Sequence, residues 1–84
     1  MDAIVFVRQP NSTDYSDLGT KEFSVLPRVD EFISTKHEKE ERFFQVVAVH
    51  HALEKKGFIE IYAVQTEPSW KLKEKRAIGF GPSN

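Results

Sequence analysis

The chain has 84 residues, enough for one small domain, and no cysteine, so neither a disulfide nor a thiolate metal site can stabilise it. Its 12 Lys and Arg residues nearly balance 13 Asp and Glu residues, and a formal net charge of −1 argues against a dedicated nucleic-acid-binding protein. Seven Phe, one Trp and two Tyr provide the large side chains that a single domain over residues 1–84 would bury.

The first predicted element is a buried strand over residues 3–8, an apolar run that ends before Gln9-Pro10. The same run is short and lacks a basic region in front of it, so it predicts neither a signal peptide nor a membrane span. We therefore expect a soluble, cytoplasmic protein that has no membrane partner. The lack of cysteine is typical of a reducing compartment.

A polar stretch follows, and its Asn, Ser, Asp and Gly residues predict a loop over residues 9–20. Alternation of Phe23 and Val25 predicts a second strand over residues 21–26, which ends at Pro27. A shorter strand is predicted over residues 31–35.

The centre of the chain contains two runs rich in β-branched and aromatic residues, over 42–51 and 58–65. Such side chains suit a pleated, half-buried surface. The connection between the runs is short and polar and ends in Gly57, as hairpin connections do. The two runs therefore predict an antiparallel hairpin at the centre of a β protein.

A helix is the alternative for residues 36–56. Thr35 and Glu38 have the spacing of a capping box, and Gly57 could end a helix. Consecutive branched and aromatic side chains lose χ1 freedom in a helix, so the strand interpretation is favoured. A short helical turn over residues 36–41 is compatible with either interpretation.

The C-terminal residues predict a further strand over 70–80 with an apolar face and a basic face, or two short strands with a bend, since Glu74 and Arg76 interrupt the apolar face. The apolar face carries Trp70, Leu72, Ile78 and Phe80, and the basic face carries Lys71, Lys73 and Lys75. Lysines in this pattern are typical of a protected edge strand. Residues 81–84 are predicted to be a flexible tail. Together, the elements predict a mainly β fold: a small antiparallel β-barrel, or an SH3-like or open meander of five to six strands.

Two segments resemble a set of small uncharacterised proteins with a Leu-Pro-Arg-x-Gly-Glu segment followed by a valine-rich strand ending in histidine. The segments are Leu26-Pro27-Arg28-Val29-Asp30-Glu31-Phe32-Ile33 and Phe44-Gln45-Val46-Val47-Ala48-Val49-His50-His51. They cover roughly a third of the chain, and Asp30 stands where the pattern usually has glycine. The resemblance implies a small β-barrel-like domain and carries no known activity.

No combination of residues indicates an enzyme. His50 and His51 are neighbours on the predicted strand, so they point to opposite faces and cannot chelate one metal together. The acidic residues alternate with basic ones, which is typical of a solvated face rather than of an acid–base pair. The acidic residues are Asp30, Glu31, Glu38, Glu40 and Glu41, and the basic ones are Lys36, Lys39 and Arg42. No serine lies in a Gly-x-Ser-x-Gly elbow. We predict a protein that is not an enzyme and has no metal site and no cofactor.

The candidate binding residues are aromatic and basic. They are Tyr62, Trp70, Lys71, Lys73, Lys75, Arg76 and Phe80. The sequence predicts a non-catalytic interaction module that binds a protein partner or a second copy of itself through a strand edge or an aromatic patch. One alternative is a small β-barrel that binds nucleic acid or a nucleotide through the basic and aromatic residues. Another is an inhibitor from a phage or mobile element that acts by covering a partner's surface.

Overall fold

The computed structural model describes residues 1–37, 39–54 and 58–67, which form a single five-stranded sheet. The strands are β1 (Asp2–Arg8), β2 (Ser16–Glu22), β3 (Phe32–His37), β4 (Glu40–His51) and β5 (Ile59–Thr66). The described residues contain no helix. The mainly β fold predicted from the sequence is therefore confirmed.

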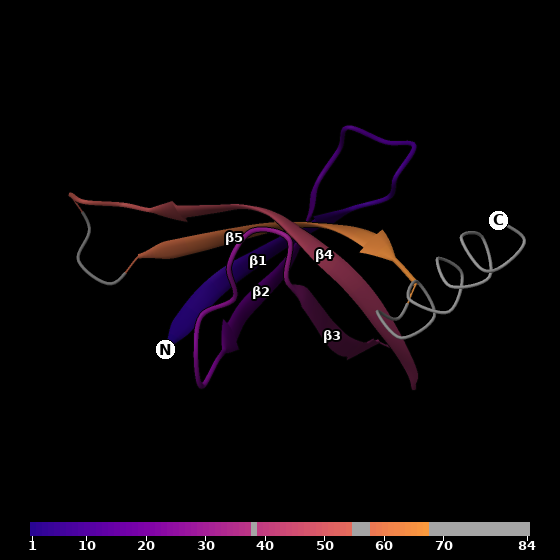
Figure 1. The fold of residues 1–84 in the computed structure, drawn as a ribbon, viewed down its shortest axis with the longest axis horizontal. Helices are drawn as coiled ribbons and strands as arrows, with labels where there is room; N and C mark the ends of the chain where they lie inside the picture. The colour runs from indigo at the N-terminus through magenta and orange to yellow at the C-terminus, as the bar shows by residue number, and fades with distance from the viewer. Residues whose placement is uncertain (38, 55–57, 68–84) are drawn as a thin grey trace, which may run out of the picture.

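The sheet has the strand order β2-β1-β5-β4-β3 and curls into a half-barrel (Figure 1). Three of its four neighbouring pairs are antiparallel, but β1 and β5 are parallel. The sheet is thus mixed rather than purely antiparallel. β1 and β5 are neighbours at the centre of the sheet, and the chain between them forms a long crossover that includes β2, β3 and β4.

The predicted central hairpin is confirmed, and the alternative helix is wrong over the described residues. β4 and β5 pair antiparallel from Phe43 opposite Thr66 to His51 opposite Ile59. The predicted short helical turn is also absent, because His37 pairs with Glu40 across a two-residue connection.

One face of the curled sheet forms the hydrophobic core. Its buried residues are Ala3, Val5, Val7, Phe44, Val46, Ile61 and Ala63. β1 alternates between buried and half-buried positions as a strand with a core face must. In β4 a bulge between Val46 and Ala48 shifts this alternation by one residue, so Val49 packs against the core and Ala48 is exposed.

The second strand lies earlier in the chain than predicted. β2 covers Ser16–Glu22, so the loop expected over residues 9–20 ends at Tyr15 and the strand expected over 21–26 ends at Glu22. Val25 is 80% exposed. The strand contains a register shift beside Gly19, whose φ of 84° is a conformation that glycine adopts without strain.

The turn before β3 requires an unusual backbone conformation at Asp30, where φ is 76°. The Glu31 N–H donates to the Arg28 carbonyl at 3.0 Å and closes the turn. Such a turn with a positive φ at its third residue favours glycine, and Asp is among the residues that tolerate it best. The short strand predicted over residues 31–35 follows as β3.

The strand predicted over residues 70–80 and the tail predicted over 81–84 lie outside the described residues.

Candidate binding groove

The half-barrel has a groove between its two outer strands, β2 and β3. The groove consists of two adjoining hollows of about 510 Å³ and about 250 Å³. Both are lined by Leu18, Thr35 and Phe44, which makes them two parts of one feature. Phe44 is only 3% exposed, so the groove has an apolar, rigid floor that belongs to the core.

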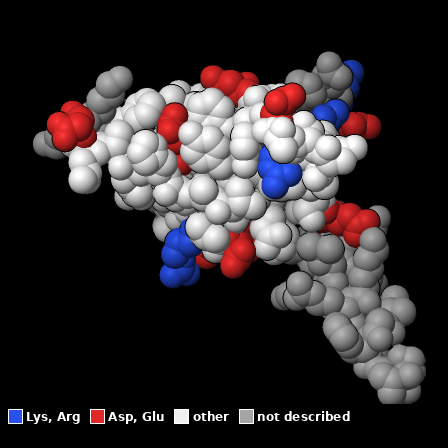
Figure 2. Space-filling view, turned by 90° about the horizontal axis from the view of Figure 1, so that it is seen from above, with Lys and Arg blue, Asp and Glu red and all other residues white. Residues whose placement is uncertain are grey.

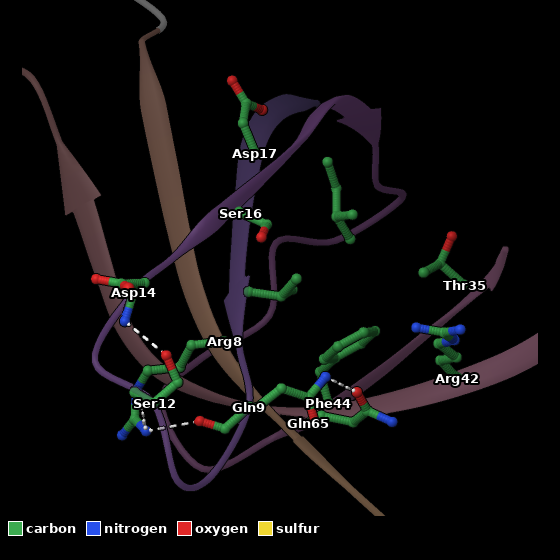
Figure 3. A pocket seen from close by; sticks show the side chains of 12 residues that line it. Arg8, Gln9, Ser12, Asp14, Ser16, Asp17, Thr35, Arg42, Phe44 and Gln65 are labelled. Carbon is green, nitrogen blue, oxygen red and sulfur yellow. Dashed lines mark hydrogen bonds between the residues drawn. The ribbon is translucent and has the colours of Figure 1, made fainter.

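The two walls of the larger hollow differ in charge. Thr35 and Arg42 are register partners on β3 and β4 and lie together on one side of the hollow (Figure 3). Ser16 and Asp17 of β2 lie on the other side, with Asp14 from the preceding loop. The larger hollow therefore has a basic wall on β3 and β4 and an acidic wall on β2, while Lys21 and Glu22 of β2 both line the smaller hollow.

Arg42 is the group in this groove with unused binding capacity. Its side chain is half-buried, yet it forms no ion pair or hydrogen bond with another residue in the described part of the chain. A guanidinium group carries five N–H donors, and its strongest partners are carboxylates and phosphates. The basic wall is therefore able to bind an anionic group that enters the groove.

Arg8, which also lines the groove, has a structural role instead. Its guanidinium donates to the Gln9 carbonyl at 3.2 Å and to the Ser12 carbonyl at 3.0 Å, and it lies 5.9 Å from the centre of the Tyr15 ring. The Gln9 side-chain amide donates to Gln65 on β5 (Figure 3). These contacts fix the β1–β2 loop at one end of the groove.

The outer edge of β3 has free backbone groups. The Val46 N–H donates to the Glu31 carbonyl at 2.9 Å. Because hydrogen bonding alternates along an antiparallel strand, Ile33 and Thr35 also direct their backbone groups to β4. The N–H and C=O groups of Phe32, Ser34 and Lys36 then point away from the sheet. No described strand lies on that side.

Tyr62, a residue predicted to bind, lies on the other face of the sheet. Its ring stacks on Phe6 with centroids 5.2 Å apart, and it contacts the edge of Tyr15 at 5.3 Å. Its hydroxyl donates to Glu60 Oε1 at 3.0 Å, and His50 Nδ1 lies 2.9 Å from the same oxygen. This cluster holds the β1–β2 loop against the outer face and does not line the groove.

The same cluster shifts two pKa values. The hydrogen bond from His50, followed by the one from Tyr62, lowers the pKa of Glu60. Burial, followed by the bond to Glu60, raises the pKa of the Tyr62 phenol. Both shifts favour a carboxylate that accepts two hydrogen bonds, which ties β4 to β5 on this face.

The other six predicted binding residues lie outside the described residues. They are Trp70, Lys71, Lys73, Lys75, Arg76 and Phe80. On the face shown in Figure 2, acidic and basic side chains are distributed singly rather than gathered into a basic patch. Within the described ranges, no three of His, Asp and Glu are placed to hold a metal ion.

Comparisons of the chain with protein-family models, curated proteins and solved structures find no match. No helix among residues 1–37, 39–54 and 58–67 is long and apolar enough to cross a membrane. The groove must therefore be interpreted from its own chemistry. The sequence predicted that Arg42 lies on a solvated face. Its place in the groove depends on three separate segments, because β3 brings Thr35 beside it and β2 brings Asp17 to the opposite wall.

Proposed function

We propose that this protein is a non-catalytic binding module that takes up an extended, acidic segment of a partner protein as an added strand on β3. The observation that carries the proposal is the free edge of β3 beside the groove. Backbone groups of Phe32, Ser34 and Lys36 would pair with the incoming segment, as they do when a peptide extends a sheet.

The side chains of β3 define the sequence that the partner should carry. Ile33 and Thr35 face the groove, the first beside Phe44 and the second beside Arg42. A strand added next to β3 would place alternate side chains into the groove. The fitting segment therefore has the pattern apolar-x-acidic, with the apolar side chain over Phe44 and the carboxylate at Arg42.

The charge of the groove supports this partner over a nucleic acid. Arg42 is opposed by Asp14 and Asp17, Arg8 is held by the β1–β2 loop, and Lys21 lies beside Glu22, so the cations that line the groove form no continuous basic track for a phosphate backbone. A single carboxylate on a peptide matches one guanidinium, whereas a polyanion would also meet the acidic wall.

The test is selection of binders from a displayed library of random linear octapeptides against the full chain. The expected binders share the apolar-x-acidic pattern, and Arg42→Gln weakens the best of them by about tenfold or more. Ser34→Pro, which removes one free N–H from the edge, abolishes binding. Arg28→Gln is the matched control, since this guanidinium is exposed, lies outside the groove and leaves the affinity unchanged.

Two outcomes would overturn the proposal. One is selected peptides whose affinity is the same for the wild type, Arg42→Gln and Ser34→Pro. The other is failure to select any peptide together with binding of single-stranded oligonucleotides whose affinity falls steeply with salt. The second outcome would assign the nucleic-acid function instead.

A further inference from the structure

The hairpin of β4 and β5 extends beyond the rest of the sheet as an arm (Figure 1). β3 pairs with β4 only as far as Gln45, and the next residue, Val46, is bonded to the turn residues Asp30 and Glu31. From Val47 onward, β4 has a described neighbour on one side only, which is β5.

The free side of this arm has backbone groups available for pairing. The Ala52 N–H donates to the Phe58 carbonyl at 3.0 Å, so Ala48, His50 and Ala52 direct their backbone groups toward β5. By the same alternation, Val49 and His51 direct theirs to the open side. This edge is independent of the β3 edge and of the groove.

The arm lacks the charges and prolines that usually protect an exposed edge, although β4 bulges where the arm begins. Residues 43–53 contain no Lys, Arg, Asp, Glu, Pro or Gly. Val47 is 42% exposed and Leu53 is 94% exposed. Natural sheets protect free edges with charges, prolines or bulges that turn the edge away, and an uncharged apolar edge is a template for pairing.

We propose that the arm pairs with the arm of a second copy of this chain, antiparallel about a two-fold axis at His50. Pairing with the chain's own turn ends at Val46 and β4 ends at His51, so the free window consists of the outward-facing residues Val49 and His51 with the residue between them. This window is centred on His50. Two copies therefore fill each other's window without displacing a described contact.

In this register Val49 lies opposite His51 of the second copy, and both have free backbone groups. Val47 is the bulge residue of β4 and Leu53 follows its last residue, so these two exposed apolar side chains flank the paired segment. No like charges face each other, because residues 43–53 carry no Lys, Arg, Asp or Glu. A second copy fits the window by symmetry, without needing a particular sequence in an unrelated partner.

The test is sedimentation equilibrium of the full chain from micromolar to near-millimolar concentration. The wild type is expected to be a dimer at the upper end, and Leu53→Lys weakens the dimer by about tenfold or more. His51→Pro, which removes a free N–H from the window, has a similar effect.

Controls make each outcome decisive. Val25→Lys changes another highly exposed apolar residue, outside the arm, and leaves the association constant unchanged. Ser34→Pro, which blocks the β3 edge, also leaves the dimer intact, so failure of the dimer and failure of the peptide-binding proposal are separable. A wild type that stays monomeric throughout, or a dimer that His51→Pro leaves at full strength, would overturn the proposed pairing.

Discussion

The edge of β2 and the edge of the β4 arm belong to the same sheet but are built in opposite ways. In β2 the Asp17 carboxylate accepts a hydrogen bond from the Gly19 N–H at 2.6 Å, and the strand bulges at this point. Lys21 and Glu22 follow as exposed charges. The arm also bulges where it begins, but residues 47–53 have no Lys, Arg, Asp or Glu and no such side-chain bond to a free N–H. The comparison indicates that β2 is protected against pairing, whereas the arm and β3 remain able to accept another strand.

The largest expected effect comes from removing the core that supports both kinds of edge. Ile61 is fully buried and lies between β1 and β4. Ile61→Ala is expected to lower the free energy of unfolding by about 2–5 kcal/mol, measured by urea denaturation. Val25→Ala, at an exposed position, should change it by less than about 0.5 kcal/mol. Equal effects of the two variants would contradict the assigned core.

Proline substitutions sharpen the distinction between the two sides of β3. The Thr35 N–H faces β4, so Thr35→Pro should lower the unfolding free energy by about 1–3 kcal/mol. Ser34→Pro removes an N–H that faces solvent and should cost much less. The pair is compared by urea denaturation. A larger loss of unfolding free energy for Ser34→Pro than for Thr35→Pro would show that the Ser34 N–H, and not the Thr35 N–H, bonds to β4.

The protection of β2 is tested by Asp17→Ala. Loss of the bond to the Gly19 N–H should lower the unfolding free energy by about 0.5–1.5 kcal/mol and leave an uncovered donor on the edge. Light scattering should then detect association that the wild type lacks when the arm is blocked by Leu53→Lys. Asp14→Ala is the matched control, because no described residue bonds to its carboxylate. Equal stability and equal association of the two variants would contradict the protective role of Asp17.

A smaller effect is expected from the contact in the middle of the arm, where Glu60 accepts hydrogen bonds from His50 and Tyr62. The lowered pKa of Glu60 means that the folded state holds its proton less tightly than the unfolded chain, whose value is about 4.3. Its contribution to stability is therefore complete above that value and is lost as pH falls through the folded pKa.

Glu60→Gln should consequently be less stable than the wild type near neutral pH, and the difference should narrow as the solution becomes acidic. Urea denaturation at a series of pH values measures this difference. A difference that stays constant with pH would mean that Glu60 does not carry the contribution.

The sequence predicted the parts of the fold that local composition determines. The runs that form β1, β4 and β5 are apolar and branched over their whole length, so their strands were recognised. β2 was missed because Leu18 is its one large apolar residue and packs against the core, while Asp17 and Gly19 resemble a loop. The parallel pairing of β1 with β5 depends on contacts between distant segments, which no local pattern reveals.

The groove was hidden for the same reason. Thr35 and Arg42 acquire their roles only when β3 folds back on β4, and Asp17 approaches the same groove through the strand that was missed. Tyr62 was recognised as an aromatic of interest, yet the fold engages it in a cluster with Phe6 and Tyr15 on the other face. The residue type of Tyr62 indicated that it makes contacts, but the pairing of the strands determined which residues it contacts.

Amide hydrogen exchange, measured residue by residue by NMR in dilute solution, tests most directly the claim that these edges are open. The account predicts slow exchange at Ile33 and Thr35 and fast exchange at Phe32, Ser34 and Lys36. It also predicts that Val49 and His51 exchange fast when dilute and become protected as the concentration rises. Uniform protection along β3, together with protection of Val49 and His51 that does not depend on concentration, would contradict it.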